Sequence, residues 1–224
     1  MHPLLHDPAL LAPGDRMSRD EFLARWYQMP SLKFAELIDG LVYMPSPLSV
    51  QHGDWDNLAG FLMRSYANKT PVCKATSQPT CLMLDSSPQP DCVLRIRPEF
   101  GGLTRIEGKL LAGRPELAVE ICVSSRSYDL GPKLDLYRRA GVPEYLAVIV
   151  EDKRFEWRVL TRGSYRLMKP TAQGIFRSRI FPGLWIDEAA FWRDDSDRLL
   201  AVLNQGLASP EHRRFLESFA GEKS

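Results

Sequence analysis

Apolar positions recur along this chain with two kinds of spacing, and each spacing predicts one kind of element. A spacing of three to four residues, typical of amphipathic helices, occurs over residues 18–29, 49–69, 128–140 and 197–207. Alternating or continuous apolar runs predict short strands at 34–38, 41–44, 72–76, 81–84, 91–96, 117–123, 144–150, 154–160, 165–168, 175–177 and 184–186. Helices and strands in this order predict an α/β protein in which helices flank a central mixed sheet.

Local signals mark where several of these elements begin and end. Ser18 and Glu21 form a capping box at the start of the first helix. The pair Asp39-Gly40 predicts a tight turn, which joins two short strands into an N-terminal hairpin. Segment 97–113 contains four glycines and mixed charges, and we expect it to be a loop.

Length and composition bound the organisation of the chain. With 224 residues it is long enough for one domain with a small attachment. We expect an irregular lead-in over 1–17, the main domain over 18–194 and a peripheral helical appendage over 195–224. The net charge of +1 neither requires nor excludes a nucleic-acid partner, because a local basic face can exist within a neutral total.

The cysteines and the apolar runs indicate a compartment. The four cysteines lack metal-binding spacing and lie in apolar contexts, which is typical of free thiols in a reducing environment. No apolar run approaches the ~20 residues that span a bilayer. The first residues do not have the pattern of a secretory signal. We therefore expect a cytoplasmic protein without a membrane partner.

Three carboxylates occur where the pattern predicts burial. Glu36 lies in the first strand of the hairpin, Asp91 follows Pro90 at the start of a strand, and Glu120 lies inside the most apolar run. An isolated buried carboxylate is unfavourable by several kcal/mol unless it is paired, hydrogen-bonded or bound to a metal. Each also has an ordinary interpretation, such as a solvent-facing strand residue for Glu36 or a strand entry for Asp91.

Taken together, two of these carboxylates suggest a metal site. The strands of Asp91 and Glu120 are separated by the glycine-rich segment and can be neighbours in one sheet. Two carboxylates brought together in this way offer the hard oxygen ligands that Mg²⁺ or Mn²⁺ prefers. Such a metal can activate water and stabilise the charge on a phosphodiester under attack.

Other polar residues are candidates for accessory roles. Lys133 directly precedes Leu134, a member of the apolar stripe on the helix over 128–140, and lies one turn before Tyr137. We expect it at the margin of the buried face, unless it is simply solvated. Tyr137, on that stripe, is a candidate accessory residue. His52 near the start of the long helix is a candidate general base or phosphate contact, and otherwise a surface group.

These residues occur in an order that resembles the Uma-type family of bacterial restriction-endonuclease-like proteins, within the PD-(D/E)xK nuclease superfamily. The resemblance covers about 18–192 and is most specific from Glu120 through Tyr145. It implies a restriction-endonuclease-like core and a Mg²⁺-dependent phosphodiesterase site. In that site Asp91 and Glu120 hold the metal, Glu36 is an additional acid and Lys133 is the cation.

One departure from the superfamily pattern keeps an alternative open. Cys122 stands two residues after Glu120, where the superfamily has a lysine, so Lys133 would supply the cation from the next helix. The leading hypothesis is a metal-dependent endonuclease that acts on DNA. The alternative is a catalytically degenerate member that binds nucleic acid or a protein partner without cleavage.

Two further features bear on partners. Segment 151–180 contains eight Lys or Arg and three acidic residues, which fits a nucleic-acid backbone or the outer face of an edge hairpin. A third hypothesis is an oligomeric scaffold, such as a homodimer, that packs through the apolar stripe of the C-terminal helix. That stripe contains Leu199, Leu200, Leu203 and Leu207.

Overall fold

A six-stranded mixed sheet forms the centre of the molecule in the computed structural model, which describes residues 10–44 and 49–220. The order of its strands is β11-β10-β9-β8-β5-β3. Strands β8 and β9 run parallel and every other neighbouring pair is antiparallel. The strand bounds are β3 Cys73–Ser77, β5 Cys92–Ile96, β8 Leu117–Cys122, β9 Glu144–Ile149, β10 Arg154–Thr161 and β11 Ser164–Leu167.

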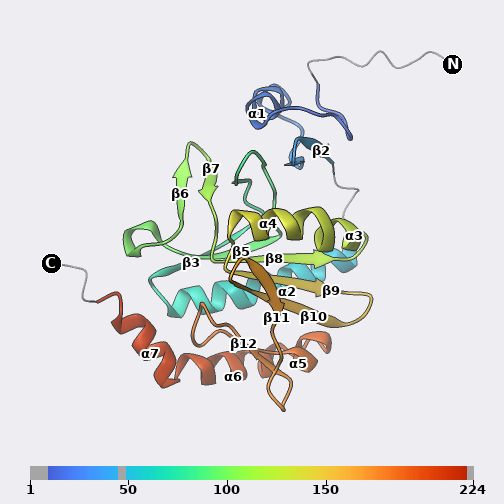
Figure 1. Cartoon of the computed structure of the whole chain (residues 1–224). Coiled ribbons are helices and arrows are strands. Elements are labelled where there is room, and N and C mark those ends of the chain that lie inside the picture. The colour runs from blue at the N-terminus through green and yellow to red at the C-terminus, as the bar shows by residue number, and fades with distance from the viewer. Residues whose placement is uncertain (1–9, 45–48, 221–224) are drawn as a thin grey trace.

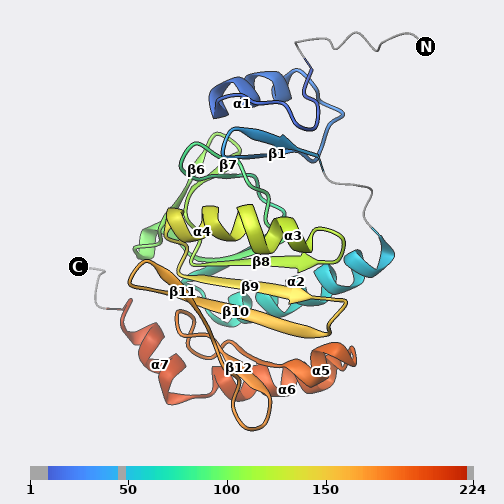
Figure 2. The same cartoon turned by 45° about the vertical axis from the view of Figure 1, so that its right-hand side comes forward.

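Helices cover both faces of this sheet (Figures 1 and 2). Helix α2 (Val50–Lys69) packs on one face, with α6 (Ser196–Leu207) beside it, and α4 (Leu134–Ala140) lies over the other face. The chain passes from β8 through α4 to β9, as expected for two parallel strands joined by a helical crossover. The observed architecture confirms the predicted mixed α/β fold.

The position of β8 between these helices explains its continuous apolar run. Side chains alternate between the faces of a strand. Leu117, Val119 and Ile121 therefore join the core under α2, whereas Ala118 and Cys122 join the core under α4. Both faces are covered, so both sets are apolar. This alternation directs Glu120 towards α4.

The N-terminal part of the chain forms a small unit with its own apolar cluster. Helix α1 (Arg19–Tyr27) packs on the hairpin of β1 (Glu36–Ile38) and β2 (Leu41–Tyr43), as Figure 2 shows. The Ser18 hydroxyl accepts a hydrogen bond from the backbone N–H of Glu21, which confirms the predicted helix start. Backbone hydrogen bonds between Leu37 and Ser87 join the hairpin to the main body.

The prediction of a loop over 97–113 is wrong. This segment contains β6 (Thr104–Glu107) and β7 (Leu110–Gly113), which form a three-stranded sheet with β4 (Cys81–Leu82). The turn at Gly108 makes a hairpin of β6 and β7, and β7 then pairs with β4 in parallel. The glycines therefore mark turns and close approaches between strands rather than one long loop.

The helix predicted over 128–140 is interrupted. It consists of α3 (Arg126–Tyr128), a π-helical turn (Asp129–Lys133) and α4. The π-helical turn contains Pro132, which cannot donate a backbone hydrogen bond within a helix. Gly141 ends α4 in the left-handed conformation, as expected for a C-terminal cap.

The C-terminal part adds strands and helices below the sheet in Figure 2. Leu199 and Leu203 of α6 are fully buried in the main core cluster, together with α2 and β13 residues. The amphipathic pattern did not reveal the last helix, α7. The bounds of these elements are β12 Ile175–Arg177, β13 Trp185–Asp187, α5 Glu188–Trp192 and α7 Pro210–Glu217.

Two general properties follow from this packing. The four cysteines are all buried free thiols. Among the described residues, no helix combines the length and the apolar character needed to cross a bilayer.

Candidate active site

Glu120 is at the centre of the buried polar cluster beneath α4. Its carboxylate is only 2% exposed and points from the middle of β8 towards the crossover helix. Two donors meet at its Oε1 atom: the Lys133 ammonium at 2.7 Å and the Tyr137 hydroxyl at 2.7 Å. The carboxylate that the sequence places in an apolar strand, where burial is unfavourable, is thus paired with groups from the next helical segment.

Lys133 is fully buried, and the prediction that it lies at the margin of the helix is wrong. Its ammonium is 3.0 Å from Glu36 Oε1 and 3.9 Å from Asp129 Oδ1, in addition to the contact with Glu120. It also donates to the backbone carbonyl of Gln89 at 3.4 Å. Lys133 lies four residues before Tyr137 and so shares its inward face. The cluster of acids is the reason why the charged side chain is stable inside.

Glu36 reaches this cluster from the N-terminal hairpin. The backbone N–H of Gln89 donates to its Oε1 at 2.6 Å. The side chain of Gln89 also takes part, because its Oε1 accepts a hydrogen bond from the backbone N–H of Ala35, the residue before β1. Gln89 therefore fixes the start of β1 through two consecutive residues, Ala35 and Glu36. This brings Glu36 to Lys133, although the two are almost 100 positions apart in sequence.

Asp91 lies just before β5, the strand that pairs with the strand of Glu120. Strands β5 and β8 are paired with Cys92 opposite Val119. Asp91 Oδ2 accepts a hydrogen bond of 2.7 Å from the backbone N–H of Ile121, the residue after Glu120. The structure thus brings together the two strands that the sequence suggested as neighbours.

His52 approaches Asp91 from the first turn of α2. Its Nε2 atom is 3.5 Å from Asp91 Oδ1, and its Nδ1 atom is buried without a hydrogen-bond partner among the described residues. The hydrogen bond to Asp91 raises the pKa of His52, and this outweighs the opposite effect of burial. Asp56, one turn further along α2, has a pKa raised to about 6, first by burial and then by Asp91.

The acids of the cluster outnumber its cations. Burial raises the pKa of Glu120 well above its ordinary value, although the Lys133 ammonium opposes this shift. Burial alone would lower the pKa of Lys133, but Glu120, Glu36 and Asp129 raise it well above its ordinary value. The contacts themselves place three carboxylates around one ammonium, and such an arrangement favours bound positive charge.

Sequence reasoning missed two members of the cluster. Asp129 is buried, its carboxylate accepts from the Ser125 hydroxyl, and burial raises its pKa to about 6. Its spacing of four residues from Lys133 on the predicted helix was a usable signal. Gln89 acts mainly through its backbone, for which the sequence carried no signal.

The donor set fits a hard divalent cation at Asp91 and Glu120. Protein donors hold Oδ2 of Asp91 and Oε1 of Glu120, and His52 lies 3.5 Å from Oδ1 of Asp91. In the described part of the chain, no group of three or more His, Cys, Asp or Glu side chains is arranged to hold a metal ion. A Mg²⁺ ion at this site would therefore depend on two carboxylates together with water and substrate phosphate.

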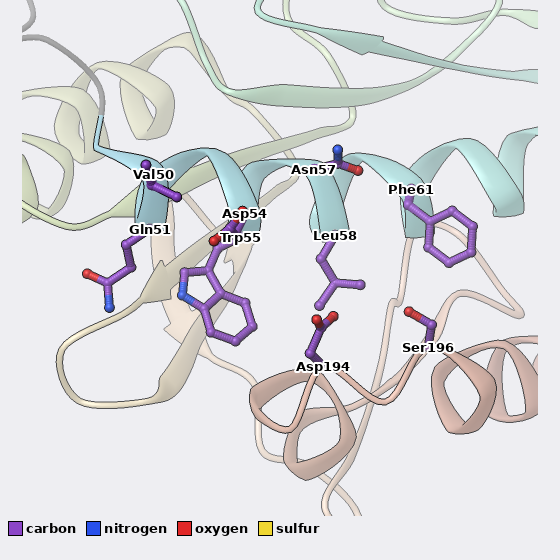
Figure 3. A pocket seen from close by; sticks show the side chains of 9 residues that line it. All are labelled: Val50, Gln51, Asp54, Trp55, Asn57, Leu58, Phe61, Asp194 and Ser196. Carbon is purple, nitrogen blue, oxygen red and sulfur yellow. The ribbon is translucent and has the colours of Figure 1, made fainter.

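A groove lies elsewhere, between α2 and the connection from α5 to α6. It has a volume of about 870 Å³, and Figure 3 shows Trp55 and Leu58 pointing from α2 towards Asp194. The two charged residues that line it, Asp54 and Asp194, are both acidic. A groove without cations does not suit a phosphodiester backbone, so the buried carboxylate cluster is the better candidate for the active site.

Comparisons with known proteins place this chain in a family. The family model of Uma2, described as "Putative restriction endonuclease", matches residues 19–189. The chain therefore belongs to this family, as its sequence resemblance predicted. A search of curated proteins gave no match.

One solved structure is similar in fold. It is described as a "putative nuclease belonging to DUF820" from Anabaena variabilis, and its TM-score is 0.63 at 15% identity. The match covers 79% of this chain and 98% of that chain. A likeness at this identity supports a shared fold. It does not show which reaction the residues carry out.

Proposed function

We propose that this protein is an endonuclease that requires Mg²⁺ or Mn²⁺ and hydrolyses phosphodiester bonds in DNA. The observation that carries the proposal is the position of Asp91, at the start of β5, beside Glu120 on the paired strand β8, next to a buried cluster in which three carboxylates surround one ammonium. Membership of a family described as restriction endonucleases supports DNA as the substrate.

Asp91 and Glu120 would hold the metal. A divalent ion bound there supplies a Lewis acid that activates water and offsets the charge of the phosphate. Asp91 is oriented by the backbone of β8, and Glu120 by Lys133 and Tyr137. Both carboxylates are thus preorganised by the fold, so little reorganisation is needed on binding.

Lys133 and Glu36 would act from the buried side of the site. The Lys133 ammonium bridges Glu36 and Glu120, so it keeps two carboxylates together that would otherwise repel each other. This cation comes from the helix after β8, and Cys122 is a buried thiol at the position where the superfamily has lysine. The nearby ammonium therefore supports an active site rather than a degenerate one.

His52 would contact the substrate from the other side of Asp91. It lies in the first turn of α2, whose N-terminal backbone N–H groups favour anions such as phosphate. Its contact with Asp91 holds the imidazole at the edge of the site. We expect it to position the scissile phosphate or to move a proton there.

The test is a plasmid-nicking assay with Mg²⁺ or Mn²⁺, comparing the wild-type protein with Asp91→Asn and Glu120→Gln. Each substitution removes a charge and keeps the side-chain shape, and we expect each to reduce cleavage by at least about 100-fold. Glu116→Gln is a matched control, because Glu116 is a buried acid just before β8, the strand of Glu120. Unchanged cleavage in both site variants, with the fold intact, contradicts the proposal.

A second candidate function is binding of nucleic acid without cleavage. The observation that favours it is Cys122 at the usual lysine position. Calorimetric titration with Mn²⁺ separates the two functions. Binding that disappears in the Asp91→Asn variant supports the nuclease, whereas DNA binding without any Mn²⁺ binding supports the second candidate.

A further inference from the structure

The two carboxylate oxygens of Glu120 have different surroundings. Both the Lys133 ammonium and the Tyr137 hydroxyl are bonded to Oε1. Among the described residues, no donor is hydrogen-bonded to Oε2, and Oε2 does not belong to the buried atoms that lack a partner. The donors therefore converge on one oxygen and leave the other open.

The fold places the Tyr137 hydroxyl at that oxygen with little freedom. The side chain is fully buried, and its ring packs against the ring of Tyr145 with centroids 5.4 Å apart. The helix that carries it ends at Gly141, one turn after Tyr137. A buried phenol needs an acceptor, and Glu120 is the one that this position supplies.

Lys133 alone would not orient the carboxylate. Its ammonium is shared among Glu36, Glu120 and the carbonyl of Gln89. An ammonium is a compact charge with rotatable donors and favours no particular carboxylate plane. A second donor from a rigid ring, on the same oxygen, restricts rotation of the carboxylate about its own bond.

We propose that Tyr137 is a positioning residue: its hydroxyl holds Oε1 of Glu120 so that Oε2 faces the divalent cation. This inference rests on the proposed function, because it assumes that Glu120 binds a metal. It adds a residue beyond the carboxylates and the lysine, and it assigns separate roles to the two oxygens of Glu120. Such supporting hydrogen bonds typically contribute 10- to 100-fold to metal affinity.

The test compares Tyr137→Phe with Tyr145→Phe in the full chain by calorimetric titration with Mn²⁺ alone. Tyr145 is a matched control, since its buried hydroxyl donates to the backbone carbonyl of Asp129 rather than to a carboxylate. We expect Mn²⁺ affinity to fall about 10-fold in Tyr137→Phe and to stay within twofold of the wild-type value in Tyr145→Phe.

A second readout separates positioning from stability. Both variants lose one buried hydrogen bond, so both lose a similar amount of stability in EDTA. The increase in Tm produced by saturating Mn²⁺ should shrink in Tyr137→Phe and persist in Tyr145→Phe. This difference does not depend on the absolute stability of either variant.

The possible failures are distinguishable. If the wild-type protein binds no Mn²⁺, the proposed function fails. If the wild-type protein binds Mn²⁺ and Tyr137→Phe binds it equally well, the positioning role is overturned while the metal site stands. An equal loss of affinity in both variants also overturns it, because the effect would then come from packing.

Discussion

Two groups of buried carboxylates lie around the parallel strands β8 and β9, and they are stabilised differently. Around Glu120, the acids share a single ammonium, that of Lys133. At the start of β9, Glu144 instead accepts four hydrogen bonds. Its donors are the Trp157 indole, the Ser178 hydroxyl and the backbone N–H groups of Arg179 and Ile180.

Glu116, just before β8, resembles Glu144. Its two oxygens accept hydrogen bonds from the backbone N–H groups of Ile96 and Leu103 at 2.9 and 2.8 Å. Glu116 thereby holds the segment between these two residues in place. Burial raises the pKa of both Glu116 and Glu144, as it does for Glu120. A raised pKa therefore does not distinguish the two groups. What differs is the partner: neutral donors satisfy the structural acids, whereas the cluster at Glu120 is left short of positive charge.

The largest expected change in stability comes from removing the Lys133 ammonium from the group of acids around Glu120. Lys133→Met leaves the carboxylates of Glu36, Glu120 and Asp129 buried without a cation, so we expect a loss of about 3–5 kcal/mol of unfolding free energy at pH 7. Urea unfolding in EDTA measures it. Lys153→Met, at an exposed turn, is the control and should change stability by less than about 0.5 kcal/mol. A loss that is equally small in Lys133→Met would show that the cluster does not need its cation.

A substitution at the structural acid should affect stability alone. Glu144→Ala leaves four donors without their acceptor, and we expect a loss of about 3 kcal/mol. Mn²⁺ affinity, corrected for the folded fraction, should remain that of the wild-type protein. Thermal unfolding and calorimetry on the same sample give both values. Weakened Mn²⁺ binding in this variant would remove the distinction between the two groups of acids.

The acids of the cluster also predict a pH dependence. The pKa of Asp129 is about 6 in the folded protein and 3.8 as its ordinary value, so between these values the folded state binds more protons than the unfolded state. Stability therefore falls as the pH rises, by about 2 kcal/mol from this group between pH 4 and 6. Asp56, with its pKa also raised to about 6, contributes in the same direction.

The Asp129→Asn variant isolates this contribution. It should flatten the stability curve between pH 4 and 6 by the amount assigned to Asp129, and leave the part that Asp56 contributes. Urea unfolding across this range, in EDTA, measures the slope. A slope identical to that of the wild-type protein would show that Asp129 does not titrate in the folded state in this window.

The smallest expected effect lies at the surface. Asp39 in the hairpin turn and Arg139 in α4 form a bidentate ion pair with both oxygens at 2.7 Å, but both side chains are substantially exposed. Arg139→Ala should reduce stability by about 0.5 kcal/mol at low salt and less at high salt. Urea unfolding at two ionic strengths checks this. A loss above about 1.5 kcal/mol would mean that this surface contact, rather than the buried polar cluster, holds the hairpin in place.

Much of this fold follows from local patterns. The Asp39-Gly40 pair specifies the N-terminal hairpin, and the capping box at Ser18 starts α1 where the sequence predicts it. The continuous apolar run of β8 indicates a strand buried on both faces, and this made Glu120 conspicuous. These features depend on residues close together in the chain, so composition and spacing carry them.

Other features depend on partners that are distant in sequence. Strand β7 forms because it pairs in parallel with β4, about 30 residues earlier, and no pattern within 97–113 announces that pairing. The structural role of Glu144 likewise comes from the backbone N–H groups of a loop 35 residues further on, and every residue type offers such a donor.

The chain by itself determined which residue types were available for the site and on which elements they lie. The family resemblance added the expected roles of Glu36, Asp91, Glu120 and Lys133. Tertiary structure alone decided that Lys133 is buried rather than marginal, because a π-helical turn and three carboxylates from separate elements surround it. The charge balance of the cluster was decided in the same way. The physical reason is that the stability of a buried charge depends on every group within a few ångströms, and only the folded chain brings those groups together.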